Sequence, residues 1–548
     1  MSFKKDLINM LEEFADLMEF KGENKFKISA FRNGANSIRR FEGDFEAAVE
    51  DGTIRDVKGI GKGLQAFIYE LKETGNVTDY DSLKNEVPQG IIDIMGIRGI
   101  GAKKVKQLFE ELGIDDLIKL EEACRNDKIA STKGFGGKTQ EKILEELERI
   151  KRESGFIHLS KATRLSEEIE EKLKNSGQVK KLAVTGELRR SMEIISKIEF
   201  VVLTDHAEGV AGIFEDSELK SGVIQVESYQ VPVLIHLTKN ESEFYKKLFT
   251  TTGSDEFLSN SGITIPEVVS SEENIFLSAD KSFVIPELRE VSYFDYKPEN
   301  SDLAFEDFKG LLHFHTVWSD GMNSLQEMRR RAEALGFEYA AVCDHSRSAF
   351  YANGLTEERV LEQTEEIAKV NAEKGITVFQ GIESDILRNG DLDYPEDFLK
   401  NFNFVVASIH SNFNLSEDEM TSRIIKAIEN PYTDLLAHPT GRLLLSRQGY
   451  KVDIKKIIDA CAENDVAIEI NANAYRLDLD WRNLFYAREK GVKISINPDA
   501  HSIEGITDTR YGIGIARKGG VKKSEVINCF DKSTFINFIN RKVTKYKN

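Results

Sequence analysis

Histidines and carboxylates that could bind metal ions stand at the ends of short apolar runs in the second half of the chain. They are His313, His315, Asp320, His345, Glu383, His410, His438, Asp499 and His501. A mixed set of imidazoles and carboxylates suits zinc, manganese or iron better than magnesium alone. Nine ligands exceed what one four-coordinate ion takes, so the set predicts two or three divalent ions, Mn²⁺, Zn²⁺ or Fe²⁺. Clustered ions lower the pKa of a bound water and create a hydroxide nucleophile.

The apolar runs before these residues define the elements that must position them. Residues 305–548 alternate short apolar strands with amphipathic helices, which predicts a parallel β/α architecture of seven strands. Strand ends converge on one face of a β/α barrel, and the two imidazoles of His-x-His lie on the same side of a strand. One histidine at a strand end is usually structural. Six histidines from five strands, with three carboxylates, favour a metal cluster.

Composition sets the limits for the rest of the chain. The 548 residues suggest roughly three or four domains, and 40% hydrophobic content excludes a disordered protein. No apolar run approaches the ~18 residues of a membrane span, so we expect no membrane partner. The four cysteines lack CxxC spacing and the first residues do not resemble a signal peptide, which indicates the cytoplasm. The net charge of −19 means that any nucleic-acid contact must be local.

Three glycine turns, each expected to open a helix, interrupt the helical pattern of residues 1–150. Their residues are Gly59, Gly61, Lys62 and Gly63 in the first turn, Gly99, Gly101, Lys103 and Lys104 in the second, and Gly134, Gly136 and Lys138 in the third. Closely spaced glycines let the backbone approach a phosphate, and the helix N-terminus supplies free N–H donors. The alternative is a helical bundle with glycine-rich connectors, which does not explain the recurring lysine. The turns resemble the helix-hairpin-helix element, which implies DNA binding that is independent of sequence.

Residues 151–290 change to a mixed helix and strand pattern. The segments 181–190, 198–203, 231–237, 249–254 and 284–290, following the glycine turns, resemble the palm and thumb of family X DNA polymerases. The resemblance extends from about residue 1 to residue 290.

The polymerase chemistry of that family does not carry over to this sequence. Where the family has Gly-Ser-x-Arg-Arg, the chain has Glu187 in place of the serine and keeps Arg190, and the Asp-x-Asp position reads Lys197-Ile198-Glu199. The third aspartate falls at His236 or, with a shift of one residue, at Ile235. Two-metal phosphoryl transfer needs converging carboxylates, so we predict a degenerate polymerase site, with Mg²⁺ as a cofactor only if that site is active.

A second position of the family pattern is also changed. Where family members with lyase activity carry a Schiff-base lysine after the first glycine turn, this chain has Phe67. The resemblance therefore does not imply that activity by this route, although Lys62 and Lys72 are close in sequence.

The C-terminal residues resemble the PHP (polymerase and histidinol phosphatase) family from His-x-His to Asp-Ala-His. Residues 437–442 and 470–476 match the branch fused behind bacterial family X polymerases. This resemblance implies a distorted seven-stranded barrel, three metal ions and hydrolysis of DNA phosphoesters. The activity implied is chiefly a 3′→5′ exonuclease, with 3′-phosphatase and abasic-site cleavage also found in the family. Arg442 and Arg476 are candidate phosphate contacts, the alternative being surface salt bridges.

The sequence as a whole predicts a multidomain α plus α/β protein. We expect a helical domain at 1–80, a fingers-like region at 81–150, a nucleotidyltransferase-type palm and thumb at 151–300, and the PHP barrel at 301–548. The leading hypothesis is a monomeric DNA-repair nuclease acting on gapped, nicked or 3′-ended DNA. The alternatives are an active gap-filling polymerase with PHP proofreading, and a DNA-binding scaffold whose barrel hydrolyses a small phosphoester.

Overall fold

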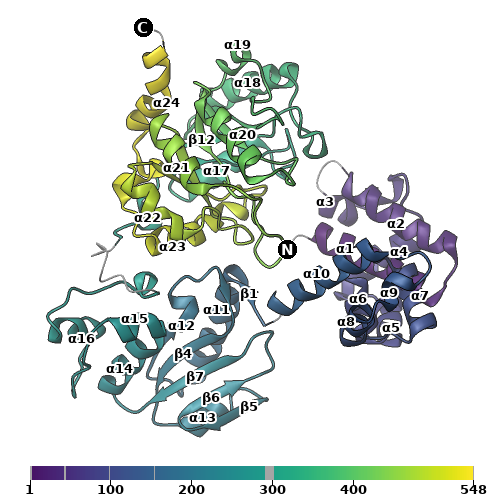
Figure 1. Cartoon of the computed structure of the whole chain (residues 1–548), viewed down its shortest axis with the longest axis horizontal. Coiled ribbons are helices and arrows are strands. Elements are labelled where there is room, and N and C mark those ends of the chain that lie inside the picture. Colours follow the sequence, from purple (N-terminus) through teal and green to yellow (C-terminus); the bar gives the residue numbers. More distant parts are fainter. Residues whose placement is uncertain (1–2, 42–44, 98, 154, 291–300, 547–548) are drawn as a thin grey trace. The chain divides into compact units, whose positions relative to one another are not determined.

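The computed structural model describes residues 3–41, 45–97, 99–153, 155–290 and 301–546. The chain divides into two compact units, Met1–Ser154 and Gly155–Asn548 (Figure 1). Within the described ranges, no helix is both long enough and apolar enough to cross a membrane.

The first unit is helical, as the apolar spacing predicts. Its elements are α1 (Phe3–Lys21), α2 (Lys25–Arg39), α3 (Phe45–Glu50), η1 (Thr53–Asp56), α4 (Lys62–Thr74), α5 (Thr78–Glu86), α6 (Gln89–Met95), α7 (Ala102–Leu112), α8 (Leu117–Arg125), α9 (Lys128–Ser131) and α10 (Gly137–Glu153). Leu7, Leu11, Phe14 and Met18 of α1 are buried because residues three and four apart share one helix face. The helices surround a single apolar core.

The second unit begins with a five-stranded mixed sheet of order β2-β4-β7-β6-β5. Its strands are β2 (Lys181–Thr185), β4 (Ile198–Leu203), β5 (Ser217–Lys220), β6 (Val223–Val226) and β7 (Val233–Thr238). Strands β4 and β7 are parallel and the other neighbours are antiparallel. The strands β1 (Ile157–His158) and β3 (Ile194–Ile195) form a separate short antiparallel pair. The helices of this region are α11 (Leu159–Asn175), α12 (Gly186–Arg189), α13 (Ala207–Ala211), α14 (Glu241–Thr252), α15 (Asp255–Asn260) and α16 (Glu272–Ser278). Residues 198–203 are all buried, which accounts for the continuous apolar run of β4.

Seven parallel strands, in sequential order from β8 to β14, form the barrel, as the sequence predicts. They are β8 (Gly310–Leu312), β9 (Tyr339–Val342), β10 (Thr377–Asp385), β11 (Phe404–Ser408), β12 (Thr433–Leu436), β13 (Ala467–Asn471) and β14 (Ile494–Asn497). The main helices between and after them are α17 (Leu325–Ala334), α18 (Glu357–Ala372), α19 (Glu396–Leu399), α20 (Glu417–Glu429), α21 (Ile454–Glu463), α22 (Trp481–Glu489), α23 (Thr509–Lys518) and α24 (Lys532–Tyr546). Both faces of the strands are covered, so their sequences are apolar without alternation.

The barrel closes between its first and last strands through two sets of contacts. At the carboxyl ends, Phe314 and Ala500 form a parallel bridge, and the His315 N–H donates to the Ala500 carbonyl at 2.9 Å. Toward the opposite end, the buried Asn528 side chain donates to the Gly310 carbonyl at 3.2 Å and accepts from the Ile496 N–H at 2.7 Å. This closure brings the segments after β8 and β14 together.

The mixed sheet and the barrel share one hydrophobic core and several ion pairs. Lys518 of α23 is fully buried, and its ammonium donates to the Arg190 carbonyl at 3.1 Å. Burial lowers the pKa of Lys518 to about 8, against the opposing effect of Glu290. Arg517 pairs with Glu287 at 2.7 Å. The second unit is therefore one packed body.

Candidate metal centre

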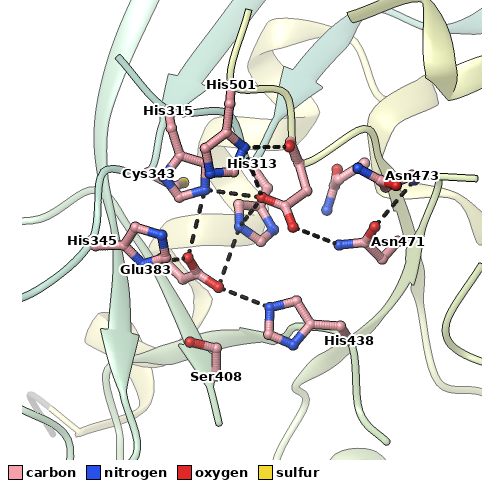
Figure 2. Close-up of polar contacts among 12 residues, drawn as sticks. His313, His315, Cys343, His345, Glu383, Ser408, His438, Asn471, Asn473 and His501 are labelled. Atoms are coloured by element: carbon pink, nitrogen blue, oxygen red, sulfur yellow. Dashed lines mark hydrogen bonds and ion pairs between the residues drawn. The ribbon is translucent and has the colours of Figure 1, made fainter. Parts of the chain in front are cut away.

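The nine residues predicted as metal ligands lie together at the carboxyl ends of the barrel strands. Figure 2 labels His313, His315, His345, Glu383, His438 and His501 among them. They come from the segment after β8 (His313, His315, Asp320), from the ends of β9 to β12 (His345, Glu383, His410, His438) and from the segment after β14 (Asp499, His501). Convergence of parallel strand ends at one face of the barrel accounts for this arrangement.

Glu383, which is 1% exposed, contacts five of the six histidines. Its Oε1 lies 3.0 Å from His438 Nε2 and 3.4 Å from His410 Nε2, and its Oε2 lies 2.9 Å from His345 Nδ1. A single carboxylate with these neighbours is suited to bridge cations.

Ligand atoms within 4.8 Å of one another form three groups among the described residues. They are His315, Asp320, His345 and His501; His313, His315 and Asp499; and His345, Glu383 and His410. His438 is outside these groups but contacts Glu383 at 3.0 Å. Because the groups share histidines, they form one cluster, with a donor set that matches the imidazole and carboxylate ligands of zinc, manganese and iron.

Several atoms that face the cluster are buried without a hydrogen-bond partner among the described residues. They are His313 Nε2, His315 Nδ1, His345 Nδ1 and Glu383 Oε2. Leaving a buried polar atom unpaired costs about 1–3 kcal/mol. A divalent cation would satisfy these lone pairs, so the residues present fit a metal centre.

The charges of the cluster shift the pKa values of its members. Burial opposes ionisation of Glu383, yet His410, His345 and His313 hold its pKa well below its usual value. Burial, with His501 and His345 nearby, lowers the pKa of His315 to about 3, so this ring is neutral and able to bind a metal.

Three of the nine residues have left-handed backbone conformations. The φ angles are +62° for His313, +27° for His438 and +50° for Asp499. A residue with a side chain seldom adopts this region, and such strain is concentrated at functional sites. The fold therefore holds these ligands in conformations that their own backbone preferences oppose.

Two carboxylates outside the predicted set orient the histidines. Glu469 of β13 is fully buried and accepts from His313 Nδ1 at 2.7 Å and from the His438 N–H at 2.8 Å. Asp385 accepts from His410 Nδ1 at 2.6 Å. A charged residue inside the apolar strand 467–471 was the signal in the sequence that could have found Glu469. Such partners fix the ring orientation of metal-binding histidines.

The two arginines predicted to contact phosphate have different surroundings. Arg476 Nε lies 3.8 Å from Asp499 Oδ2, so this side chain reaches the cluster. Arg442 instead pairs with Asp480 at 2.7 Å, lies 3.5 Å from Glu193 of the mixed-sheet domain, and donates from Nε to the Arg476 carbonyl. Arg442 thus connects the loop that carries Arg476 to the neighbouring domain.

The polymerase positions of the mixed sheet form ion pairs with one another. Buried Glu199 lies 3.1 Å from Lys197 Nζ and 3.2 Å from His236 Nε2, so His236, rather than the fully buried Ile235, shares its face. The Glu187 carboxylate accepts from the Ser196 N–H at 2.6 Å.

Arg190, the remaining residue predicted as a polymerase position, also binds other groups of the protein. Its Nε pairs with Glu290 Oε2 at 2.6 Å, and its Nη1 donates to the Thr252 carbonyl at 2.8 Å. The Arg190 guanidinium is thus held by contacts within the second unit.

The three glycine turns of the first unit have one shared geometry. Gly59, Gly99 and Gly134 have φ angles of +98°, +89° and +88°, and α4, α7 and α10 each begin three residues later. In the described structure, a Cβ atom at Gly61, Gly101 or Gly136 would meet no atom within 4 Å. Internal packing therefore does not require glycine at these three positions, whereas close approach of a ligand to the backbone would.

Comparison with known proteins identifies the family. Residues 2–77 match the helix-hairpin-helix domain, residues 91–149 the SAM-like helix-hairpin-helix tandem, and residues 312–473 the PHP domain. The chain is 35% identical to the DNA polymerase/3′-5′ exonuclease PolX of Bacillus subtilis (strain 168), over 96% of this chain and 97% of that protein. The chain belongs to the PolX family.

Two further relatives match about a third or more of this PolX-family chain. A probable phosphatase of Thermoanaerobacter sp. (strain X514) is 29% identical over 39% of this chain and 88% of its own length. A probable phosphatase of Acetivibrio thermocellus is 31% identical over 34% of this chain and 78% of its own length. The family and fold expected from the motifs are confirmed.

Replacement of Glu469 by glutamine should weaken retention of divalent ions by about ten- to hundredfold, because loss of an orienting partner has effects of that size. Competition with a chromophoric chelator measures the retention. Glu338→Gln, which removes an exposed carboxylate paired with Lys309 at 2.8 Å, is the matched control. Equal ion retention by the wild type and Glu469→Gln would contradict the orienting role.

Proposed function

We propose that this protein is a DNA-repair nuclease of the PolX family. Its barrel hydrolyses DNA phosphoesters from the 3′ end, with 3′-phosphatase or abasic-site cleavage as related activities, and its palm does not synthesise DNA. The observation that carries the proposal is the convergence of the ligand residues on one face of the barrel, where eight of the nine form three groups with shared histidines and the ninth, His438, contacts Glu383. The 3′-5′ exonuclease in the printed name of the Bacillus relative supports the same reaction.

The nine residues would hold two or three divalent ions, with Mn²⁺ or Zn²⁺ favoured and Fe²⁺ also compatible. Such ions supply an activated water and neutralise charge on the phosphoryl oxygens. We assign Arg476, whose Nε lies 3.8 Å from Asp499 Oδ2, to contact a non-bridging phosphate oxygen with its guanidinium. Asp385 holds His410 through Nδ1 and leaves Nε2 directed at Glu383. In this arrangement Arg442 acts on the reaction by fixing the Arg476 loop.

The division of the chain follows from the same proposal. A boundary near residue 80 is supported by the two helix-hairpin-helix matches, which end at residue 77 and begin at residue 91. The palm and thumb then cover 151–300 and the PHP barrel 301–548. We further propose that the protein acts as a cytoplasmic monomer on gapped, nicked or 3′-ended DNA.

A small-molecule phosphoesterase is the second candidate, because two of the relatives are named as probable phosphatases. The helix-hairpin-helix matches favour DNA over it. Rates on a 3′-recessed oligonucleotide and on a small phosphomonoester, measured at equal enzyme concentration, decide between the two.

The cluster should be essential for hydrolysis. Changing His313 and His315 together to alanine should abolish digestion of a 3′-ended oligonucleotide, because both rings belong to the ligand groups. Asp391→Asn, which alters an exposed carboxylate paired with Lys426 at 2.8 Å, is the control. Digestion at the wild-type rate by the double variant in metal-controlled buffer would reject the assignment.

The glycine turns should supply binding that is independent of sequence. Replacing Lys104 and Lys138 with glutamate should weaken DNA binding for every sequence alike and flatten the dependence on salt, since phosphate contacts carry no base information. Titration of labelled duplexes at several salt concentrations measures both effects. Lys25→Glu/Lys119→Glu gives the same change in net charge away from the turns and should have little effect. A changed sequence preference with an unchanged salt slope would be the contrary result.

The palm should not extend a primer across a one-nucleotide gap, in magnesium or manganese. Lys197 Nζ lies 3.1 Å from the Glu199 carboxylate, and no second carboxylate stands at the predicted Asp-x-Asp position, so the carboxylates needed to hold two ions and a triphosphate are missing. Like charges ~4 Å apart cost about 4 kcal/mol at an effective dielectric of 20. At ~1.4 kcal/mol per tenfold in rate, several such losses reduce synthesis below detection.

The extension assay uses the His313→Ala/His315→Ala variant with all four deoxynucleotides, so that digestion cannot hide synthesis. Template-directed extension by this variant would make the gap-filling polymerase the better assignment for the palm.

A further inference from the structure

Exposed apolar side chains of the second unit are concentrated around the metal centre. Among the residues that the structure describes there, eight large apolar side chains are exposed: Val268, Leu277, Val317, Met322, Phe350, Tyr351, Leu361 and Tyr475. Five of them, at 317, 322, 350, 351 and 475, lie in the loops that follow β8, β9 and β13. Scattered apolar residues need no explanation, but a group at the rim of a reaction centre indicates contact with a ligand.

Phe350 and Tyr351 are the most notable members of this group. Their side chains are 86% and 62% exposed, in the short 3₁₀ helix η5 (Phe350–Ala352). The Tyr351 ring centroid lies 6.4 Å from that of the ligand His345 and 6.2 Å from that of Phe350. The Tyr351 ring therefore lies next to a ligand of the metal centre, and the Phe350 ring lies next to Tyr351.

Tyr351 lies beside the ligand cluster, because its ring is next to that of His345. Arg476 reaches the same cluster, with its Nε 3.8 Å from Asp499 Oδ2. The ligand cluster thus has two kinds of binding group beside it, the aromatic ring of Tyr351 and the guanidinium of Arg476. The ring suits the base of a nucleotide, and the guanidinium and the cluster suit its phosphate.

The loop that carries the two rings is firmly held. The Leu355 N–H donates to the His345 carbonyl at 2.8 Å, and the Gly354 N–H donates to the Ala349 carbonyl at 3.1 Å. A Cβ atom at Gly354 would overlap the Ser346 carbonyl, so only glycine fits there. The rings are therefore exposed on a preorganised support, which lowers the entropy lost on binding.

A neighbouring loop reinforces this support. The Asn353 side-chain amide donates to the Trp318 and Ser319 carbonyls, each at 3.3 Å. That loop also presents Val317 and Met322, which are 54% and 56% exposed. The apolar rim thus continues from the loop after β9 to the loop after β8.

We propose that Phe350 and Tyr351 form a stacking platform for the unpaired terminal bases of a DNA 3′ end. The inference rests on the proposed function and specifies its substrate: a single-stranded or frayed 3′ tail, with its last phosphodiester at the cluster. Aromatic side chains bind every base through its π face, so the platform selects unpaired bases without selecting a sequence. A duplex end must lose its terminal pair before its bases can reach these rings.

The test compares two single-stranded 3′ tails that differ only in their bases. One ends in thymidines, and the other ends in two abasic tetrahydrofuran residues with the same phosphodiesters. Wild-type protein with Mn²⁺ should digest the thymidine tail about ten- to hundredfold more efficiently, mainly through a lower KM, as expected for one or two stacked bases. The Phe350→Ala/Tyr351→Ala variant should digest both tails with similar efficiency.

Two further variants separate stacking from other effects. Phe350→Tyr/Tyr351→Phe keeps both aromatic faces and should retain the preference for the thymidine tail. Leu361→Ala changes a side chain of α18 that is 53% exposed and should also retain it. Both results are expected only if the aromatic faces produce the preference.

Each contrary outcome has a distinct meaning. If the wild type digests both tails equally, or if the double alanine variant keeps the preference, the rings do not stack on DNA bases. A role of these rings in binding a protein partner or a second copy would give the second of these results. If the wild type digests neither tail, the proposed nuclease function itself fails, and this inference fails with it.

Discussion

Closure of a barrel that has only seven strands is the constraint on which the reaction centre depends. The gap between β8 and β14 is bridged at the carboxyl ends by Phe314 and Ala500. The residue before each of them, His313 and Asp499, is in the left-handed region, with φ of +62° and +50°. The chain thus turns sharply at both ligands in order to meet across the gap. The strained backbone at His313 and Asp499 thus belongs to the turns that close the barrel. The same turns bring His315 Nε2 to 3.0 Å from Asp499 Oδ1.

That geometry explains why the cluster was largely predictable from the sequence. Parallel strand ends must converge, so a histidine or carboxylate at each end is enough to place the ligands without knowledge of packing. The orienting partners were not predictable in the same way. Glu469 lies in the middle of a buried strand, where a period-two pattern cannot tell an orienting carboxylate from a paired structural one. The partners of Arg442 were also hidden, because Glu193 comes from a different domain, about 250 residues away in the sequence.

The mixed sheet is well packed, although the residues predicted as polymerase positions depart from the pattern of family X polymerases. Arg189 pairs with Glu272 at 2.6 Å, and the fully buried Arg289 pairs with the same carboxylate. Removing one partner of a buried pair leaves an uncompensated buried charge, so the loss of any one of these residues would destabilise the fold. Lys518 of the barrel adds a buried contact to the Arg190 carbonyl. These contacts couple the mixed sheet to the barrel within one packed body.

An acidic chain can bind a polyanion only where its local charge and backbone differ from the average. The net charge of −19 repels DNA at long range. In the glycine turns, Gly59, Gly99 and Gly134 have positive φ angles, and a Cβ at Gly61, Gly101 or Gly136 would meet no neighbouring atom within 4 Å, so the helix starts offer the kind of anion site that a phosphate would use. At the barrel, acidic ligands become attractive to DNA only when divalent ions reverse their charge. In the proposed function, binding and hydrolysis would thus use different physical means, helix N-termini in one unit and divalent cations in the other, and neither would require a basic protein surface.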